Sequence, residues 1–395
     1  MKLGIDLHNV TGGGGLSYMT NILRHFDPQK HGFTSICLFG SEKVLARMPD
    51  SLHIEKHPQP ILAKSLPYRL FFMFFMLGRE LKRTGCNLLY SPGGLYFGGF
   101  RPFVTISRNM MPFEPQLWSL YPRFSFDRLR LILLRHAHAA TFRRADGMIF
   151  LTKIAKRIVG DAMRTTRGRT AVISHGVNRH LFLREACQPL PQSIVLQKQI
   201  RLVYPSRLEP YKHQVEVIQA ITDLREEFPA ITIDLCGPAN PQYKEAVDAT
   251  LRVCDPDGSF VHYYGELLPT ELPALYHQCQ LLIFASSCEN LPNTLIEALS
   301  FGIPIVCSQS DPMPEVAQHA CVYFDPTDRQ SIVQAIRSTL YDWPSALERV
   351  KTGQDLAARY SWQTCAEQTF LFLYEQLKPA NKVLPVNSVN QKVSK

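Results

Sequence analysis

Short apolar runs alternate with amphipathic stretches along the first half of the chain. The runs that predict strands lie at residues 3–7, 34–39, 87–90, 103–106, 145–150 and 170–173. Helical patterns lie between them, notably at residues 16–26, which follow a run of four glycines, and at residues 68–83 and 126–143. Because strands and helices alternate, we predict an α/β fold with a parallel, doubly wound sheet over this half.

A second series of the same kind follows a break in the pattern. Residues 178–198 lack periodicity and contain Pro189 and Pro191, which is typical of a linker. Apolar runs return at residues 201–204, 231–236, 260–263, 281–284, 303–307 and 321–324, and an amphipathic helix ends the series. We therefore predict Rossmann-like domains at 1–177 and 199–360, a linker at 178–198, a final helix at 361–377 and a disordered polar tail at 378–395.

Two carboxylates, Glu289 and Glu297, lie eight residues apart after the apolar run at 281–284. The pattern places Glu289 in a turn at the carboxyl end of a strand and Glu297 on the helix that follows. Ligands bind at that edge of α/β sheets, and a helix N-terminus there attracts phosphates. A carboxylate on the helix can accept hydrogen bonds from the vicinal hydroxyls of a sugar. The alternative is a surface helix whose two acids face water.

The segment around these acids resembles the retaining glycosyltransferases of family 4, which have the GT-B architecture of two Rossmann-like domains facing a central crevice. The matching residues are Ser286, Glu289, Glu297, Ala298, Gly302 and Pro304, and the resemblance runs from about residue 3 to about residue 372. It implies that Glu289 contacts the transferred sugar and supports its developing charge, and that Glu297 holds the nucleotide ribose. Many relatives carry glycines after the first acid, where backbone N–H groups touch the sugar. Asn290 and Leu291 stand there in this chain and are predicted donor contacts.

Two cations follow the first strand of the predicted second domain. Arg207 and Lys212, five residues apart, can clamp two phosphates from neighbouring edges of a crevice, although exposed surface cations are the alternative. The family has a matching pair that neutralises the diphosphate leaving group. Because these cations and a helix N-terminus can stabilise that charge, and the sequence has no Asp-x-Asp pattern, we expect a reaction without a metal ion or other cofactor.

Further site residues follow from the family pattern. Gly14 and Gly15, in the glycine run after the first strand, would let the backbone approach the donor diphosphate from the first domain. A tight turn is the alternative. Gly265, at a strand end, would lie close to the donor. Many relatives have a His-Asp pair where this chain has Arg108 and Asn109. We predict that Asn109 bonds a sugar hydroxyl and assists catalysis, with a capping or loop-bridging role as the alternative.

The positive charge of the chain is concentrated in one stretch. The net charge is +9, and residues 123–170 hold ten arginines and two lysines against three aspartates. This stretch predicts an anionic partner, either acidic lipid or a phosphorylated acceptor, unless it is only a solvated helix face. No nucleic-acid-binding signature accompanies it, so we expect no nucleic acid as partner.

Two other features bear on the cellular setting. The phenylalanine-rich run at 70–77 is far shorter than the ~20 residues of a spanning helix, and it predicts either a core helix or an interfacial one. The ten cysteines are scattered without a C-x-x-C pair and predict buried free thiols in a reducing compartment. We therefore expect a cytoplasmic protein that can bind the inner face of the cytoplasmic membrane.

These features together lead to a functional expectation. The chain would be a retaining glycosyltransferase that moves a hexose, with mannose favoured, from a nucleoside-diphosphate sugar to a lipid-linked saccharide in bacterial surface polysaccharide biosynthesis, including that of lipopolysaccharide. Two alternatives are a sugar-nucleotide epimerase of the same fold and a non-catalytic module that binds sugar nucleotides or lipid.

Overall fold

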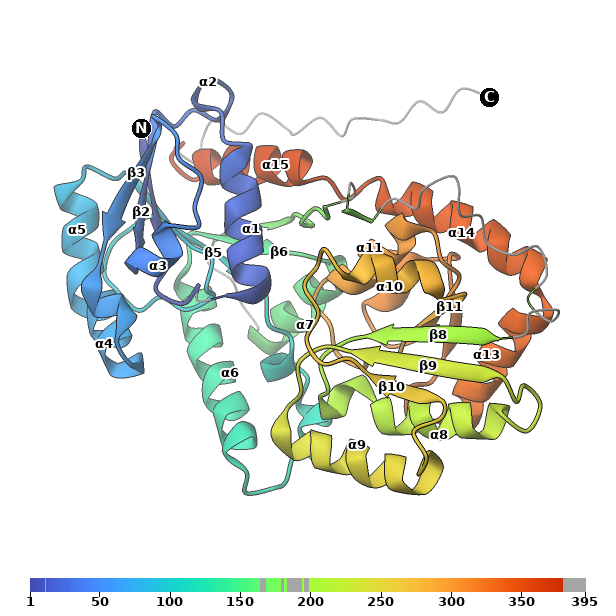
Figure 1. Cartoon of the computed structure of the whole chain (residues 1–395). Helices are drawn as coiled ribbons and strands as arrows, with labels where there is room; N and C mark the ends of the chain where they lie inside the picture. Colours follow the sequence, from blue (N-terminus) through green and yellow to red (C-terminus); the bar gives the residue numbers. More distant parts are fainter. Residues whose placement is uncertain (11, 164–167, 179–180, 183–193, 195–198, 379–395) are drawn as a thin grey trace, which may run out of the picture.

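The computed structural model describes residues 1–378 apart from residues 11, 164–167, 179–180, 183–193 and 195–198. Figure 1 shows two sheets, each with its own helices, lying next to each other. The linker predicted at 178–198 and the tail predicted at 378–395 fall almost wholly outside the described residues.

The first sheet has seven strands, and every pair of neighbours in it is parallel. Their order is β3-β2-β1-β4-β5-β6-β7, so the direction of winding reverses between β1 and β4. The strands are β1 (Lys2–Asp6), β2 (Ser35–Gly40), β3 (Ile54–Pro58), β4 (Leu88–Ser91), β5 (Phe103–Ser107), β6 (Gly147–Phe150) and β7 (Arg169–Val172). The helices are α1 (Gly13–Arg24), α2 (Pro28–His31), α3 (Glu42–Leu45), α4 (Leu66–Phe71), α5 (Leu77–Arg83), α6 (Phe126–Arg144) and α7 (Lys153–Met163).

The second sheet has six parallel strands in the order β10-β9-β8-β11-β12-β13. The strands are β8 (Ile200–Pro205), β9 (Ile231–Cys236), β10 (Val261–Tyr263), β11 (Leu281–Phe284), β12 (Ile305–Ser308) and β13 (Val322–Phe324). The helices are α8 (Gln214–Leu224), α9 (Pro241–Cys254), α10 (Leu272–Gln278), α11 (Asn293–Phe301), α12 (Met313–Ala317), α13 (Arg329–Tyr341), α14 (Trp343–Ala357) and α15 (Trp362–Glu375). The prediction of two doubly wound α/β domains is therefore confirmed.

Local details differ from the prediction at three places. Strand β3 was not predicted, because its sequence Ile-Glu-Lys-His-Pro has one apolar residue and forms a sheet edge. The helix predicted at 68–83 is divided by a π-helical segment, Phe72–Met76, between α4 and α5. Three residues of the glycine run, Gly13 to Gly15, form the first turn of α1, and Gly12 is the residue before the helix.

The last helix, α15, returns to the first domain and packs across α1 and α2 (Figure 1). The Trp362 ring meets Tyr18 of α1 edge to face, with ring centres 6.2 Å apart. The Phe370 ring stacks on His31 at 5.0 Å. At Gly32, whose φ is 74°, a Cβ atom would come within 2.6 Å of the Tyr374 ring, so this contact requires glycine.

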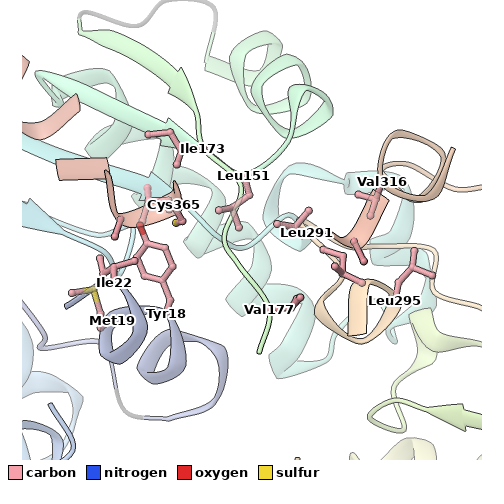
Figure 2. Packing of buried hydrophobic residues seen from close by; sticks show 14 of the residues in the cluster. Tyr18, Met19, Ile22, Leu151, Ile173, Val177, Leu291, Leu295, Val316 and Cys365 are labelled. Carbon is pink, nitrogen blue, oxygen red and sulfur yellow. The ribbon is translucent and has the colours of Figure 1, made fainter. Parts of the chain in front are cut away.

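One buried apolar cluster joins the two domains. Figure 2 shows Leu151, which follows β6 in the first domain, near Leu291, which follows β11 in the second. Cys365 of α15 belongs to the same cluster. The described cysteines are all free, and all except Cys254 are buried, as predicted.

Polar contacts reinforce this joint. The Glu315 carboxylate of α12 accepts hydrogen bonds from the backbone N–H groups of Lys153 and Ile154, at 2.8 and 2.9 Å. An acid of the second domain thus caps the N-terminus of α7 in the first, where the helix dipole favours negative charge. Thr152 completes the cap, since its Oγ1 accepts from Ala155 N at 3.0 Å and donates to the Asn290 carbonyl at 3.3 Å.

No helix in the described part of the chain is both long enough and apolar enough to cross a membrane.

We predict that Glu315→Ala lowers the unfolding free energy by about 1–2 kcal/mol, since it removes the cap of α7. Differential scanning calorimetry would show this as a lower melting temperature. Glu348→Ala is the matched control, because Glu348 is exposed on α14 and should change stability by no more than ~0.5 kcal/mol. Equal effects of the two substitutions would show that the cap contributes nothing.

Candidate active site

A central crevice of about 380 Å³ lies between the carboxyl ends of the two sheets. Segments that follow β5, β6, β8 and β11 supply most of its walls, and the first turn of α1 contributes one residue. The lining residues are Gly14, Arg108, Leu151, His175, Ser206, Arg207, Tyr211, Lys212, Phe284, Glu289, Asn290, Leu291, Pro292, Asn293 and Thr294. Most of the site residues predicted from the sequence therefore meet in one place.

Glu289 and Lys212 form an ion pair in the crevice. Their side chains are only 18% and 11% exposed, so each charge relies on the other for much of its stabilisation. The Lys212 ammonium also lies 5.4 Å from the ring centres of both Tyr211 and Phe284.

Hydrogen bonds hold the turn that carries Lys212. The Tyr204 hydroxyl donates to the Lys212 carbonyl at 2.6 Å. His213, in the left-handed region with φ 54°, shares a 2.9 Å hydrogen bond between its Nε2 and the Ser287 hydroxyl. Because Ser287 precedes Glu289 by two residues, this bond ties the turn of the cation to the loop of the acid.

The crevice lining is rich in positive charge. Arg207 lies at the rim with a side chain 60% exposed and its guanidinium 3.7 Å from Glu209. Arg108 lies on the opposite wall, and its guanidinium is 5.2 Å from the Tyr18 ring centre. With Lys212, three cations line the crevice against the single acid Glu289. This excess suits an anionic ligand with two phosphates.

The N-terminus of α1 also points to an anion. Gly14 lines the crevice, and the first turn of α1 leaves backbone N–H groups without helical partners. Gly15 does not line the crevice. It lies under Arg108, where a Cβ atom would come within 3.1 Å of the guanidinium. The structure thus brings Gly14 to the site, whereas Gly15 makes room for a cation that lines it.

Asn290 and Leu291 line the crevice and also connect the domains. The Asn290 amide donates to the Ser107 carbonyl at 2.9 Å, while its own Oδ1 is buried and has no partner within the described residues. Leu291 packs in the shared apolar cluster near Leu151 (Figure 2). The segment that replaces the glycines of many relatives therefore closes the joint behind Glu289.

A side hollow of about 190 Å³ adjoins the crevice and shares Ser206, Arg207 and Thr294 with it. The other lining residues are Pro205, Cys236, Gly237, Pro238, Leu267 and Leu272. Glu297 lies one turn after Thr294 on α11 and is partly buried. Desolvation of this carboxyl raises its pKa to about 7. Gly265 does not line either space. Its carbonyl accepts from the Gly237 N–H, at 2.6 Å, behind the wall of the hollow.

The structure does not bring Asn109 together with Glu289. Asn109 Oδ1 accepts from the Met111 N–H at 3.2 Å, so its side chain stabilises the local turn. The residue lines an outer cavity of about 370 Å³, whose walls are Asn109, Met111, Tyr121, Asp127, Arg130, Leu131, Leu134, Arg207, Glu209, Tyr211, Ala239, Asn240 and Pro241. Its neighbour Arg108 faces the crevice instead.

Other lining residues were not among the predicted site residues. His175 is buried, stacks on Trp362 with ring centres 5.6 Å apart, and bonds the Gly176 carbonyl through Nδ1 at 3.2 Å. Burial lowers its pKa to about 4, so the ring is neutral at neutral pH. Tyr211 lines both the crevice and the outer cavity. Only the position of these residues after predicted strands or turns signals them in the sequence.

Among the described residues, one group of side chains is close enough to share a metal ion, namely Cys37, Glu55 and His57. They lie on β2 and β3 of the first sheet and do not line the crevice.

Comparison with known proteins identifies the second domain. Residues 190–355 match the family model described as glycosyl transferases group 1. The O-antigen chain mannosyltransferase B of Escherichia coli is 28% identical over 189 residues, which are 46% of this chain and 48% of that protein. The match thus spans about half the length of this relative. The expected resemblance to glycosyltransferases is therefore found for residues 190–355, at the level of glycosyl transferases group 1.

Solved structures extend the likeness to the whole fold. Sucrose-phosphate synthase from Thermosynechococcus elongatus superposes with a TM-score of 0.72 and 17% identity, over 95% of this chain and 99% of that one. The Anabaena protein HepE, solved with UDP and glucose, gives a TM-score of 0.65 and 19% identity over 93% and 98%. These likenesses confirm the GT-B fold.

We predict that Glu297→Gln changes stability in a pH-dependent manner. With its pKa raised to about 7, the folded chain binds more protons at Glu297 than the unfolded chain does, so wild-type stability falls as pH rises from about 4.5 to about 7. The neutral amide does not titrate, so its unfolding free energy does not fall in this way. On going from pH 4 to pH 8, the unfolding free energy of the variant should therefore rise relative to that of wild type by on the order of 2–3 kcal/mol. Denaturant titrations at both pH values measure it, and an unchanged difference would contradict a buried acid.

Proposed function

We propose that this chain transfers a hexose from a nucleoside-diphosphate sugar to a saccharide hydroxyl, with retention at the anomeric carbon. The match of residues 190–355 to glycosyl transferases group 1 supports this reaction class. The observation that carries the proposal is the Lys212–Glu289 pair in a crevice that Arg207 and the N-terminus of α1 also line. A diphosphate needs cations and N–H donors, and a transferred sugar needs a hydroxyl acceptor. This crevice supplies both within one cavity.

The donor would lie across the crevice and the side hollow. Its diphosphate would meet Arg207, Lys212 and the N–H groups around Gly14, since these are the cationic and dipolar groups that converge there. The nucleoside would occupy the side hollow beside Thr294, with Glu297 one turn away to accept hydrogen bonds from the ribose hydroxyls. The sugar would then lie toward Glu289.

The ion pair explains how donor binding prepares the acid. When phosphate oxygens approach Lys212, its ammonium can exchange Glu289 for the diphosphate, because both partners are anionic. Glu289 is then left to accept hydrogen bonds from the sugar hydroxyls and to support positive charge near the anomeric carbon. Asn290 and Leu291 fix the loop that holds it.

The bonds that change can be assigned without an enzymic nucleophile. The bond between the anomeric carbon and the phosphate oxygen breaks, and the acceptor oxygen forms a bond to the same carbon from the same face. The acceptor proton passes to the leaving phosphate, whose charge Arg207 and Lys212 stabilise. We propose that these cations serve in place of a metal ion. The side chains that close the crevice would exclude water and so limit hydrolysis of the donor.

Mannose is the sugar we propose, and the acceptor is a lipid-linked saccharide in bacterial surface polysaccharide biosynthesis. The similarity to an O-antigen chain mannosyltransferase supports mannose and a surface polysaccharide. The basic stretch at residues 123–170 supports an acceptor or surface that carries phosphate. The chain would then work at the inner face of the cytoplasmic membrane.

We predict that the two acids fail in different ways when each is replaced by glutamine. Glu289→Gln should lower kcat at least ~100-fold, since Glu289 acts on the reacting sugar, and should not raise the nucleoside diphosphate Kd, since Lys212 is then released from its ion pair. Glu297→Gln should raise that Kd about tenfold or more, since a hydrogen bond to a charged group contributes about 1.5–3 kcal/mol. Calorimetric titration and a transfer assay with chromatography of the products measure both quantities.

Glu226→Gln, on the exposed surface after α8, is the control and should change neither quantity. Full turnover by Glu289→Gln would contradict the assignment of this site. Formation of a new sugar nucleotide without any acceptor would instead establish an epimerase.

A further inference from the structure

Exposed apolar side chains are concentrated in two segments of the first domain. Within the described chain, nine of the seventeen exposed large apolar residues lie at positions 66–75 and 124–133. Single exposed apolar residues are ordinary on protein surfaces, but a contiguous group marks an interaction site.

The second of these segments forms one stripe on α6 and the turn before it. Phe126, Leu129 and Leu133 are 78%, 55% and 61% exposed, and their spacing of three and four residues places them on one helix face. Phe124, just before the helix, is 95% exposed. We call these four residues the α6 stripe.

The first segment is less open than the α6 stripe. The Phe74 ring stacks on Phe97 with centres 5.6 Å apart, and Phe71 lies against Phe75 at 5.2 Å. These rings therefore cover one another in part. Among the described residues, the α6 stripe makes one aromatic contact, in which the Arg123 guanidinium lies 6.0 Å from the Phe124 ring centre.

Two arginines lie beside the α6 stripe. Arg130 is next to it on the helix surface and Arg123 precedes Phe124, whereas Arg128 and Arg135 lie toward the opposite side of α6. Asp127 is the single acid of this segment. None of these four arginines forms an ion pair with another described residue. A helix with aromatic and leucine side chains on one face and arginines beside them has the composition of helices that lie in the interface of anionic membranes.

The neighbouring face of the same helix lines the outer cavity. Asp127, Arg130 and Leu134 contribute to that wall, and Arg207 and Tyr211 line both this cavity and the central crevice. Figure 1 shows α6 extending from the first domain next to α9 of the second. One helix therefore has an apolar row that faces solvent and, on the neighbouring face, a row of mixed polarity that lines the outer cavity.

We propose that the α6 stripe docks this chain on an anionic membrane surface, with the outer cavity beside it as the route by which a lipid-linked acceptor reaches the crevice. The α6 stripe enters the headgroup region, and the flanking Arg123 and Arg130 bind lipid phosphates. Docking requires only the stripe and its arginines. The acceptor route rests in addition on the proposed transferase function.

Vesicle sedimentation of the full chain tests the docking without any donor or acceptor. Wild type should sediment with vesicles that contain phosphatidylglycerol and much less with vesicles of phosphatidylcholine alone. Phe126→Ser/Leu129→Ser should lower the apparent partition coefficient at least tenfold. The matched control is Val253→Ser/Leu268→Ser, which replaces residues 82% and 64% exposed in the second domain and should leave sedimentation unchanged.

A second variant reports on the stripe directly. The emission of Leu133→Trp should shift to the blue when phosphatidylglycerol vesicles are added, because the indole leaves water. Calorimetric titration with nucleoside diphosphate should give the same Kd for the serine variant as for wild type. A failure of docking is therefore separate from a failure of the transferase proposal.

Three results would overturn the proposal. The first is equal sedimentation of wild type and the Phe126→Ser/Leu129→Ser variant. This includes the case in which sedimentation falls only when Phe71, Phe74 and Phe75 are replaced, which would place the docking surface in the other segment. The second is vesicle binding that is abolished by 0.5 M salt but is the same in wild type and the serine variant. That result would show that the arginines bind the vesicles without the apolar side chains. The third is a stripe that mediates dimers of this chain in analytical ultracentrifugation and does not bind vesicles.

Discussion

The ion pair between Lys212 and Glu289 is the interaction on which the site depends. It holds an acid and a cation, each mostly buried, at the carboxyl edge of the second sheet. Removing either partner would leave the other charge buried with little solvation. The ion pair therefore persists until a ligand takes the place of one partner. Two hydrogen bonds position this pair. The Tyr204 hydroxyl bonds the Lys212 carbonyl, and His213 bonds Ser287, so the two backbone segments that carry the pair are fixed.

Contacts between the domains fix the two walls of the crevice relative to each other. The loop after Glu289 makes the joint, with Asn290 bonded to Ser107 and Leu291 packed near Leu151. Glu315 and α15 add further contacts from the second half of the chain to the first. The same loop thus positions the acid and fixes the domain that faces it.

Much of this arrangement could be predicted from the sequence, for identifiable reasons. Inner strands such as β6 and β11 are continuous apolar runs, since parallel strands are buried on both faces. The edge strand β3 carries charged residues and gives no such signal. Which of the adjacent residues Arg108 and Asn109 faces the crevice depends on the backbone direction after β5, which residue types alone do not determine. The Glu315 cap joins positions 162 residues apart, and no local pattern reveals it.

The most direct test of the account is the thermal stability of the chain against a panel of nucleoside diphosphates. A ligand at ~100 times its Kd should stabilise the fold by roughly 2.7 kcal/mol. We expect one base to raise the melting temperature, and Arg207→Gln to reduce that shift while Arg252→Gln, an exposed arginine on α9, leaves it intact. No shift with any nucleotide, or an equal shift in both variants, would contradict a diphosphate site in this crevice.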